Sequence, residues 1–161
     1  MNPIRVFAMT TASQIDPREI GRSTDTSKMT PATAAAMCAG MPSLWYKAAA
    51  LKWADDWSGA NDLEYRLWIE AAGLASEHGW EPPRGQEFLR RMSMLAIAEM
   101  AWPSKYKQDK DKCKFLDINQ SAFCKRWKGR YEQIYQVLES WASEGYRYVL
   151  RKNVDGGEIF N

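Results

Sequence analysis

Histidine and cysteine are scarce in this chain of 161 residues, and their scarcity excludes several kinds of site. His78 is the only histidine, and none of the three cysteines, Cys38, Cys113 and Cys124, belongs to a CxxC pair. Metal sites need clustered His, Cys or carboxylate ligands, so we expect no bound metal and no cofactor. Three scattered cysteines are typical of reduced thiols, which favours a cytoplasmic location.

Long apolar runs and catalytic motifs are also missing. No run of about 18 apolar residues is present, which predicts no membrane span, and residues 1–20 lack the pattern of a secretory signal. There is no GxxxxGK[ST] or GxGxxG phosphate loop and no GxSxG nucleophile motif. A Ser or Cys nucleophile would depend on His78 alone. We therefore expect that the chain is not an enzyme.

Aromatic residues, in contrast, are plentiful, with eight Trp, seven Tyr and five Phe. Side chains of this bulk fill cores and interfaces. Apolar residues recur at helical intervals, which predicts an all-α bundle with short connections. Asn61 with Glu64 matches a capping box, and Gly79 is expected to end that helix. The predicted helices cover residues 30–39, 43–57, 62–78 and 84–101.

Charge divides the chain unevenly. Residues 103–153 hold 12 Lys and Arg against 6 Asp and Glu, a balance of +6, whereas residues 29–102 hold 6 against 9, a balance of −3. A basic end joined to an acidic body indicates a polyanionic partner for the basic end. A lysine-rich solvated surface is the alternative. We expect three regions: a flexible arm at 1–28, an acidic Trp-rich helical bundle at 29–103, and a basic segment at 104–161.

The basic segment can be placed on the plan of a helix-turn-helix module, which needs a supporting helix, a tight turn and a recognition helix. Residues 107–116 would form the supporting helix, with Cys113 and Leu116 facing the core. Residues 117–119 would form the turn. The recognition helix would begin at Gln120 and be held by Phe123 and Trp127, four residues apart.

The rest of that helix is then free to face duplex DNA. Gln and Ser side chains can read base edges, while Lys and Arg suit phosphates. A single module binds weakly, which favours a homodimer or a further contact. The predicted DNA-binding residues are Gln120, Ser121, Lys125, Arg126, Lys128 and Arg130.

The stretch from Phe123 to Trp141, FCKRWKGRYEQIYQVLESW, resembles the C-terminal part of small helix-turn-helix proteins encoded by bacteriophages and prophages. These include late-gene regulators and antitermination proteins of the Q type. The resemblance covers about 40 residues and implies DNA binding, transcription regulation and contact with RNA polymerase. The chain departs from the pattern at Asp117, where glycine is preferred, and Gly129 is expected to interrupt the long helix.

Two alternatives stay open. Gly145 is expected to end the last helix, and residues 146–160 alternate in a way that fits either a short β-hairpin wing or a frayed helical end. The function could instead be that of a non-enzymatic module, a phage inhibitor or adaptor that grips a host protein. In that case the tryptophans would act as aromatic anchors, notably Trp45, Trp53, Trp57 and Trp68.

Overall fold

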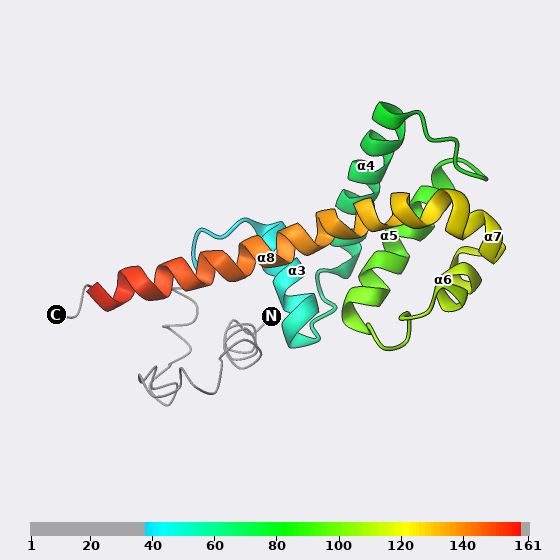
Figure 1. The fold of residues 1–161 in the computed structure, drawn as a ribbon. Coiled ribbons are helices and arrows are strands. Elements are labelled where there is room, and N and C mark those ends of the chain that lie inside the picture. Colours follow the sequence, from blue (N-terminus) through cyan, green and yellow to red (C-terminus); the bar gives the residue numbers. More distant parts are fainter. Residues whose placement is uncertain (1–37, 159–161) are drawn as a thin grey trace. The chain divides into compact units, whose positions relative to one another are not determined.

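The structure is a computed structural model that describes the backbone of residues 38–158 and the side chains as far as Lys152. The predicted arm and nearly all of the helix expected at 30–39 lie outside this range. Every regular element within it is a helix (Figure 1), which confirms the all-α class. Within these residues no helix is long and apolar enough to cross a membrane.

The first four helices of the described residues are separated by loops, and the remaining elements follow a short turn at residues 117–119. The described residues divide into two compact units, residues 38–58 with 141–158 (the first unit) and residues 59–140 (the second unit). The elements are α3 (Ser43–Ala54), α4 (Ala60–His78), α5 (Gln86–Ala101), α6 (Asp109–Leu116), α7 (Gln120–Ala122), the π-helical turn η2 (Phe123–Trp127) and α8 (Lys128–Glu158).

In the first unit, α3 packs closely against the later part of α8. A Cβ atom on Gly145 would lie 2.6 Å from the carbonyl oxygen of Trp45 and 3.1 Å from the Cβ of Ala49, so only glycine fits this contact. The Trp53 and Tyr146 rings lie 5.7 Å apart, centroid to centroid. Gly145 therefore serves close helix packing, and the expectation that it ends the helix is wrong.

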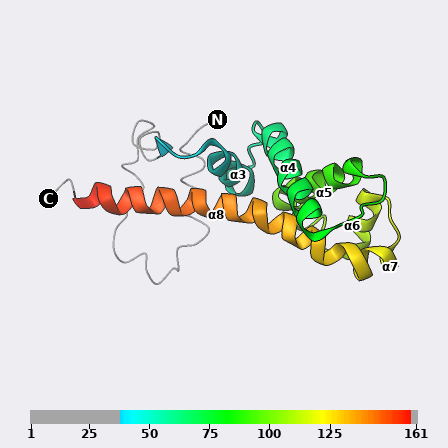
Figure 2. The ribbon, with the colours of Figure 1, turned by 90° about the horizontal axis from the view of Figure 1, so that it is seen from above.

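The hairpin alternative for the tail is also wrong over the described residues. Helix α8 runs unbroken to Glu158, and the views in Figures 1 and 2 both draw it as one continuous coil. The buried residues Ala142, Gly145 and Val149 are three and four apart, the spacing of a helix face. Tyr and Arg alternate after Gly145, a pattern that also fits a strand, but the buried residues lie at helical spacing. The packing of this buried face therefore favours the helix. Gly129 likewise lies inside α8 and does not interrupt it.

In the second unit, α4 and α5 run antiparallel and share a core. Arg90 forms an ion pair with Glu64 (2.8 Å), and the indole of Trp68 donates to Gln86 (3.2 Å), so that later residues of α4 pair with earlier residues of α5. The apolar face predicted for α5 is buried throughout, and that predicted for α4 is buried except at Leu74, which is only partly buried. The buried residues are Leu63, Leu67, Ala71 and Ala75 on α4 with Phe88, Met92, Leu95, Ala96 and Met100 on α5.

Helix ends differ from the predictions by a few residues, for local reasons. α3 stops at Ala54 because Asp55 adopts a left-handed conformation, with φ of 50°. α4 begins at Ala60 without a side-chain cap, so the predicted capping role of Asn61 is wrong. Arg84 and Gly85 both have positive φ, and α5 starts only after them. Gly79 ends α4 with φ of 63°, as predicted.

A polar cluster fastens three helices of the second unit together. The Tyr131 hydroxyl donates to the Glu99 carboxylate, which also accepts from the Lys112 ammonium at 3.0 Å. Tyr131 is fully buried, and burial, followed by the bond to Glu99, raises its pKa far above the usual range. Burial also raises the pKa of Tyr135 to about 12. The cluster fixes α6 and the start of α8 against α5.

Candidate nucleic-acid interface

A three-residue turn separates α6 from the helix that begins at Gln120, at the boundaries that the sequence predicts. Asp117 is left-handed, with φ of 55°, and the backbone N–H of Ile118 donates to the Cys113 carbonyl (3.2 Å). This bond closes the end of α6. Asn119 then caps the next helix, since its side-chain oxygen accepts from the Ala122 N–H at 2.8 Å. Asp117 thus takes the conformation for which glycine is the usual residue.

Arg84 braces this turn from the loop before α5. Its guanidinium donates to the Leu116 carbonyl at 2.8 Å and forms an ion pair with the Asp117 carboxylate at 3.2 Å. A carbonyl that α6 leaves without an intrahelical partner is thereby satisfied. Sequence reasoning missed Arg84, and nothing in the local pattern indicates that it reaches the turn.

The helix after the turn is held by aromatic side chains. Phe123, Trp127 and Tyr131 are all buried, at 0%, 4% and 1% exposure, which confirms the predicted inward direction of the first two. The Trp127 ring meets Phe88 of α5 edge-on, with centroids 4.8 Å apart. Residues 123–127 form a π turn, whose wider coil keeps Phe123 and Trp127 on one side of the helix.

Four polar side chains of this helix start are open to solvent, and two of them, Ser121 and Lys125, lie opposite Phe123 by helical spacing. Gln120, Ser121, Lys125 and Arg126 are exposed, and no ion pair ties Lys125 or Arg126 to another described residue. These four of the six predicted DNA-binding residues therefore lie within two turns of each other, free to meet a partner.

Lys128 and Arg130 are held by other groups. The Lys128 ammonium lies 2.9 Å from the Asp109 carboxylate of α6, and this hydrogen bond, followed by the carboxylate charge, raises its pKa. The guanidinium of Arg130 lies 4.7 Å from the centroid of the Trp127 ring and 5.6 Å from that of Trp80. Lys128 therefore fastens the helix to α6, whereas Arg130 is half-buried over two indole faces.

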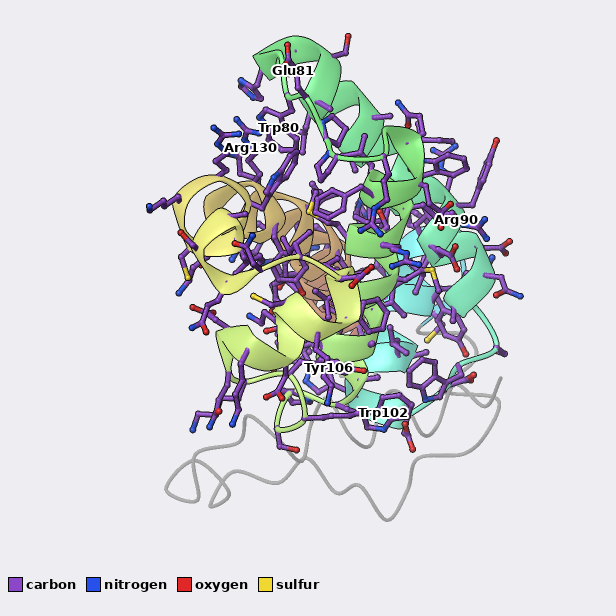
Figure 3. All side chains as sticks on the ribbon, turned by 90° about the vertical axis from the view of Figure 1, so that its right-hand side faces the viewer. Trp80, Glu81, Arg90, Trp102, Tyr106 and Arg130 are labelled. Carbon is purple, nitrogen blue, oxygen red and sulfur yellow. The ribbon has the colours of Figure 1, made fainter. Side chains whose placement is uncertain are left out.

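A groove of about 720 Å³ runs beside the helix start. Asn119, Arg126 and Arg130 line one side, and Glu81 and Pro83 of the loop after α4 line another. The labelled side chains of Trp80, Glu81 and Arg130 gather at one end of Figure 3. The two guanidiniums suit an anion at this groove, and Glu81 limits how many such groups it would accept.

Side chains that ligate metals are scattered in the part of the chain that the structure describes. Among the described residues, no group of three or more His, Cys or carboxylate side chains could hold a metal ion. His78 lies at the end of α4 and stacks on Trp80, with ring centroids 6.1 Å apart. Sequence reasoning does not identify Trp80 as the ring that lies under Arg130.

Comparisons with known proteins give no further guide to this site. No protein-family model, no curated protein and no solved structure matches the chain.

Proposed function

We propose that this protein binds duplex DNA through the helix that begins at Gln120 and regulates transcription. The observation that carries the proposal is the division of this helix start into two sides: Phe123 and Trp127 are buried, while Ser121 and Lys125, each two residues from Phe123, are exposed. A helix that enters the major groove needs this combination of a fixed rear face and a free polar front.

The exposed residues match the chemistry of DNA. Gln120 and Ser121 would read base edges, while Lys125 and Arg126 would contact phosphates. Arg130 would add a phosphate contact from the groove, and the stacked indoles would hold its guanidinium in place before DNA arrives. Lys128 is better assigned to positioning the helix, because its ammonium is already paired with Asp109.

The wider role follows the resemblance to phage and prophage regulators. We infer a cytoplasmic regulator or antiterminator that contacts RNA polymerase as well as DNA. The basic segment supports the DNA part of this proposal, because Lys110 and Lys114 of α6 are exposed and add positive charge to the helix before the turn.

The proposal is tested by charge reversal on the open side of the helix. Fluorescence anisotropy with a labelled duplex of mixed sequence at low salt would compare the natural chain with Lys125→Glu/Arg126→Glu. We expect the double variant to bind at least about tenfold more weakly, because two phosphate contacts become repulsive. Lys152→Glu, an equal change per site in the first unit, is the control and should retain binding.

Circular dichroism should show unchanged helicity in both variants, because all three side chains are exposed. The proposal is wrong if the natural chain fails to bind duplex DNA at low salt, or if the double variant binds as tightly as the control. Lys128→Glu is not a suitable test, since it would also break the ion pair with Asp109.

A protein-interaction role is the second candidate function, and Trp102 favours it. Its side chain is 47% exposed, and Lys105 lies over its ring at 5.5 Å; Figure 3 labels Trp102 beside Tyr106. The four tryptophans expected as anchors, Trp45, Trp53, Trp57 and Trp68, are each only partly exposed. Capture of a host protein that resists nuclease treatment but is lost in Trp102→Ala would favour this function over DNA binding.

A further inference from the structure

The outward face of α4 carries apolar side chains at helical spacing. Tyr65 is 59% exposed and Ile69 is 45% exposed, on the side opposite the buried Leu63 and Leu67. Gly73 lies one further turn along, and a Cβ atom there would meet nothing within 4 Å. Because residues four apart lie on one face of a helix, these three positions form a continuous stripe. Along it, the bulky Tyr65 is followed by the apolar Ile69 and then by Gly73, which has no side chain.

Two opposite charges lie along one side of this stripe, and neither has a partner among the described residues. Arg66 and Glu70 are both exposed, and neither takes part in an ion pair within the described residues. They are four residues apart with the cation first, the less favourable order for a pair within one helix. Each charge is therefore available to a group on another molecule.

We propose that the stripe is the contact between two copies of this chain, with the two α4 helices packed antiparallel about a two-fold axis at Ile69. Tyr65 and Gly73 are each four residues from Ile69, about 6 Å along the helix. The two-fold axis therefore sets each Tyr65 ring over the partner's Gly73, where the missing side chain leaves room. Ile69 meets its own copy at the centre.

The same symmetry pairs the flanking charges. Arg66 and Glu70 lie on the same side of the stripe, and the two-fold axis places Arg66 of one copy about two residue rises, roughly 3 Å along the helix axis, from the partner's Glu70. The long side chains span this offset, and the reverse pair forms at the other end. The surface is thus self-complementary in shape and in charge. A surface that binds an unrelated protein does not need complementary shape and complementary charge about a two-fold axis. We therefore assign this face to a second copy of the chain.

The contact would be modest in strength and independent of DNA binding. One helix pair buries less than the roughly 1,200–2,000 Å² of a standard stable interface, so we expect dissociation in the micromolar range. None of the proposed DNA-binding residues lies on α4, so dimer formation and DNA binding can be tested independently of each other.

Charge reversal and its rescue test the arrangement. Sedimentation velocity of the full chain without DNA, over a concentration series, would compare Arg66→Glu, Glu70→Arg and the double reversal. Each single reversal places two like-charge pairs across the two-fold axis, and we expect it to weaken the dimer by roughly tenfold or more. The double reversal rebuilds both ion pairs and should restore association.

Two further variants make the test decisive. Ile69→Asp puts two carboxylates at the centre and should leave only monomer, while Lys125→Glu, an exposed change off this face, should leave the dimer intact. A natural chain that is monomeric at every concentration overturns the proposal. So does a dimer that ignores the single reversals, or a double reversal that fails to restore association. Retained helicity by circular dichroism separates loss of the dimer from loss of the fold.

Discussion

The contact at Gly145 predicts that one substitution will have opposite effects at two glycines of the same helix. Gly145 and Gly129 both lie inside α8. A Cβ atom at Gly145 would come within 2.6 Å of the Trp45 carbonyl oxygen, whereas one at Gly129 would meet nothing within 4 Å. Gly145→Ala should therefore destabilise the protein, and Gly129→Ala should stabilise it.

The magnitudes follow from two opposing terms. Alanine is favoured over glycine inside a helix by about 1 kcal/mol, because glycine loses more backbone entropy on folding. At Gly129 this gain should appear almost in full. At Gly145 the overlap is with backbone, which can yield only if α3 and α8 move apart, and overpacking of this kind costs about 1–3 kcal/mol. We expect a net loss of up to about 2 kcal/mol there, so that the two variants differ by about 1–3 kcal/mol.

Urea unfolding followed by circular dichroism at 222 nm would measure the free energy of unfolding of both variants, with thermal unfolding as a second probe. For a chain of this size the difference corresponds to roughly 2–12 °C in Tm. A Gly145→Ala variant that gains stability equal to that of Gly129→Ala would refute the close contact between α3 and α8.

Two further predictions concern the polar cluster of the second unit. Glu99→Ala leaves the nearly buried Lys112 ammonium, 13% exposed, without its carboxylate. Urea unfolding should therefore show a free energy of unfolding lower by about 3 kcal/mol, and adding Lys112→Met should recover part of that loss. A Glu99→Ala variant as stable as the natural chain would contradict this prediction. Burial raises the pKa of Tyr131, so the folded protein favours the neutral phenol. The contribution of Tyr131 to stability is complete below the pKa of about 10 that tyrosine has in the unfolded chain, and it declines as the pH rises above that value. The free energy of unfolding should therefore fall between about pH 9 and 11, and less steeply in Tyr131→Phe; identical slopes would count against the assignment.

The parts of the fold that the sequence predicts are those set by local patterns. The buried faces of α4 and α5 follow from apolar residues at helical spacing. The turn at 117–119 lies where the sequence predicts it, and the side chain of Asn119 closes it by accepting from the Ala122 N–H. Each of these features depends on residues within about one helical turn of each other.

The parts that the sequence does not predict depend on residues far apart in the chain. Gly145 marks a helix end by composition, but its contact with Trp45, 100 residues away, makes it a packing residue. The sequence indicates that Arg130 and Lys128 are free cations. In the structure Arg130 lies over the Trp80 ring and Lys128 is paired with Asp109. Helical periodicity shows which face of a helix points inward, but not which other element will cover that face.

The charge balance of the basic segment overstates the number of cations that DNA would meet. Of its 12 Lys and Arg residues, four are paired with carboxylates in the structure: Lys112, Lys128, Arg147 and Arg151. Each phosphate contact lowers log K by about 0.9 per unit of log salt, so contacts by Lys125, Arg126 and Arg130 alone would give a slope of about −3. A slope near −5 would mean that Lys110 and Lys114 also reach the backbone, which places α6 against the same duplex. The salt dependence therefore measures how much of the basic surface takes part, and a slope near zero would leave the helix at Gln120 without a role in binding DNA.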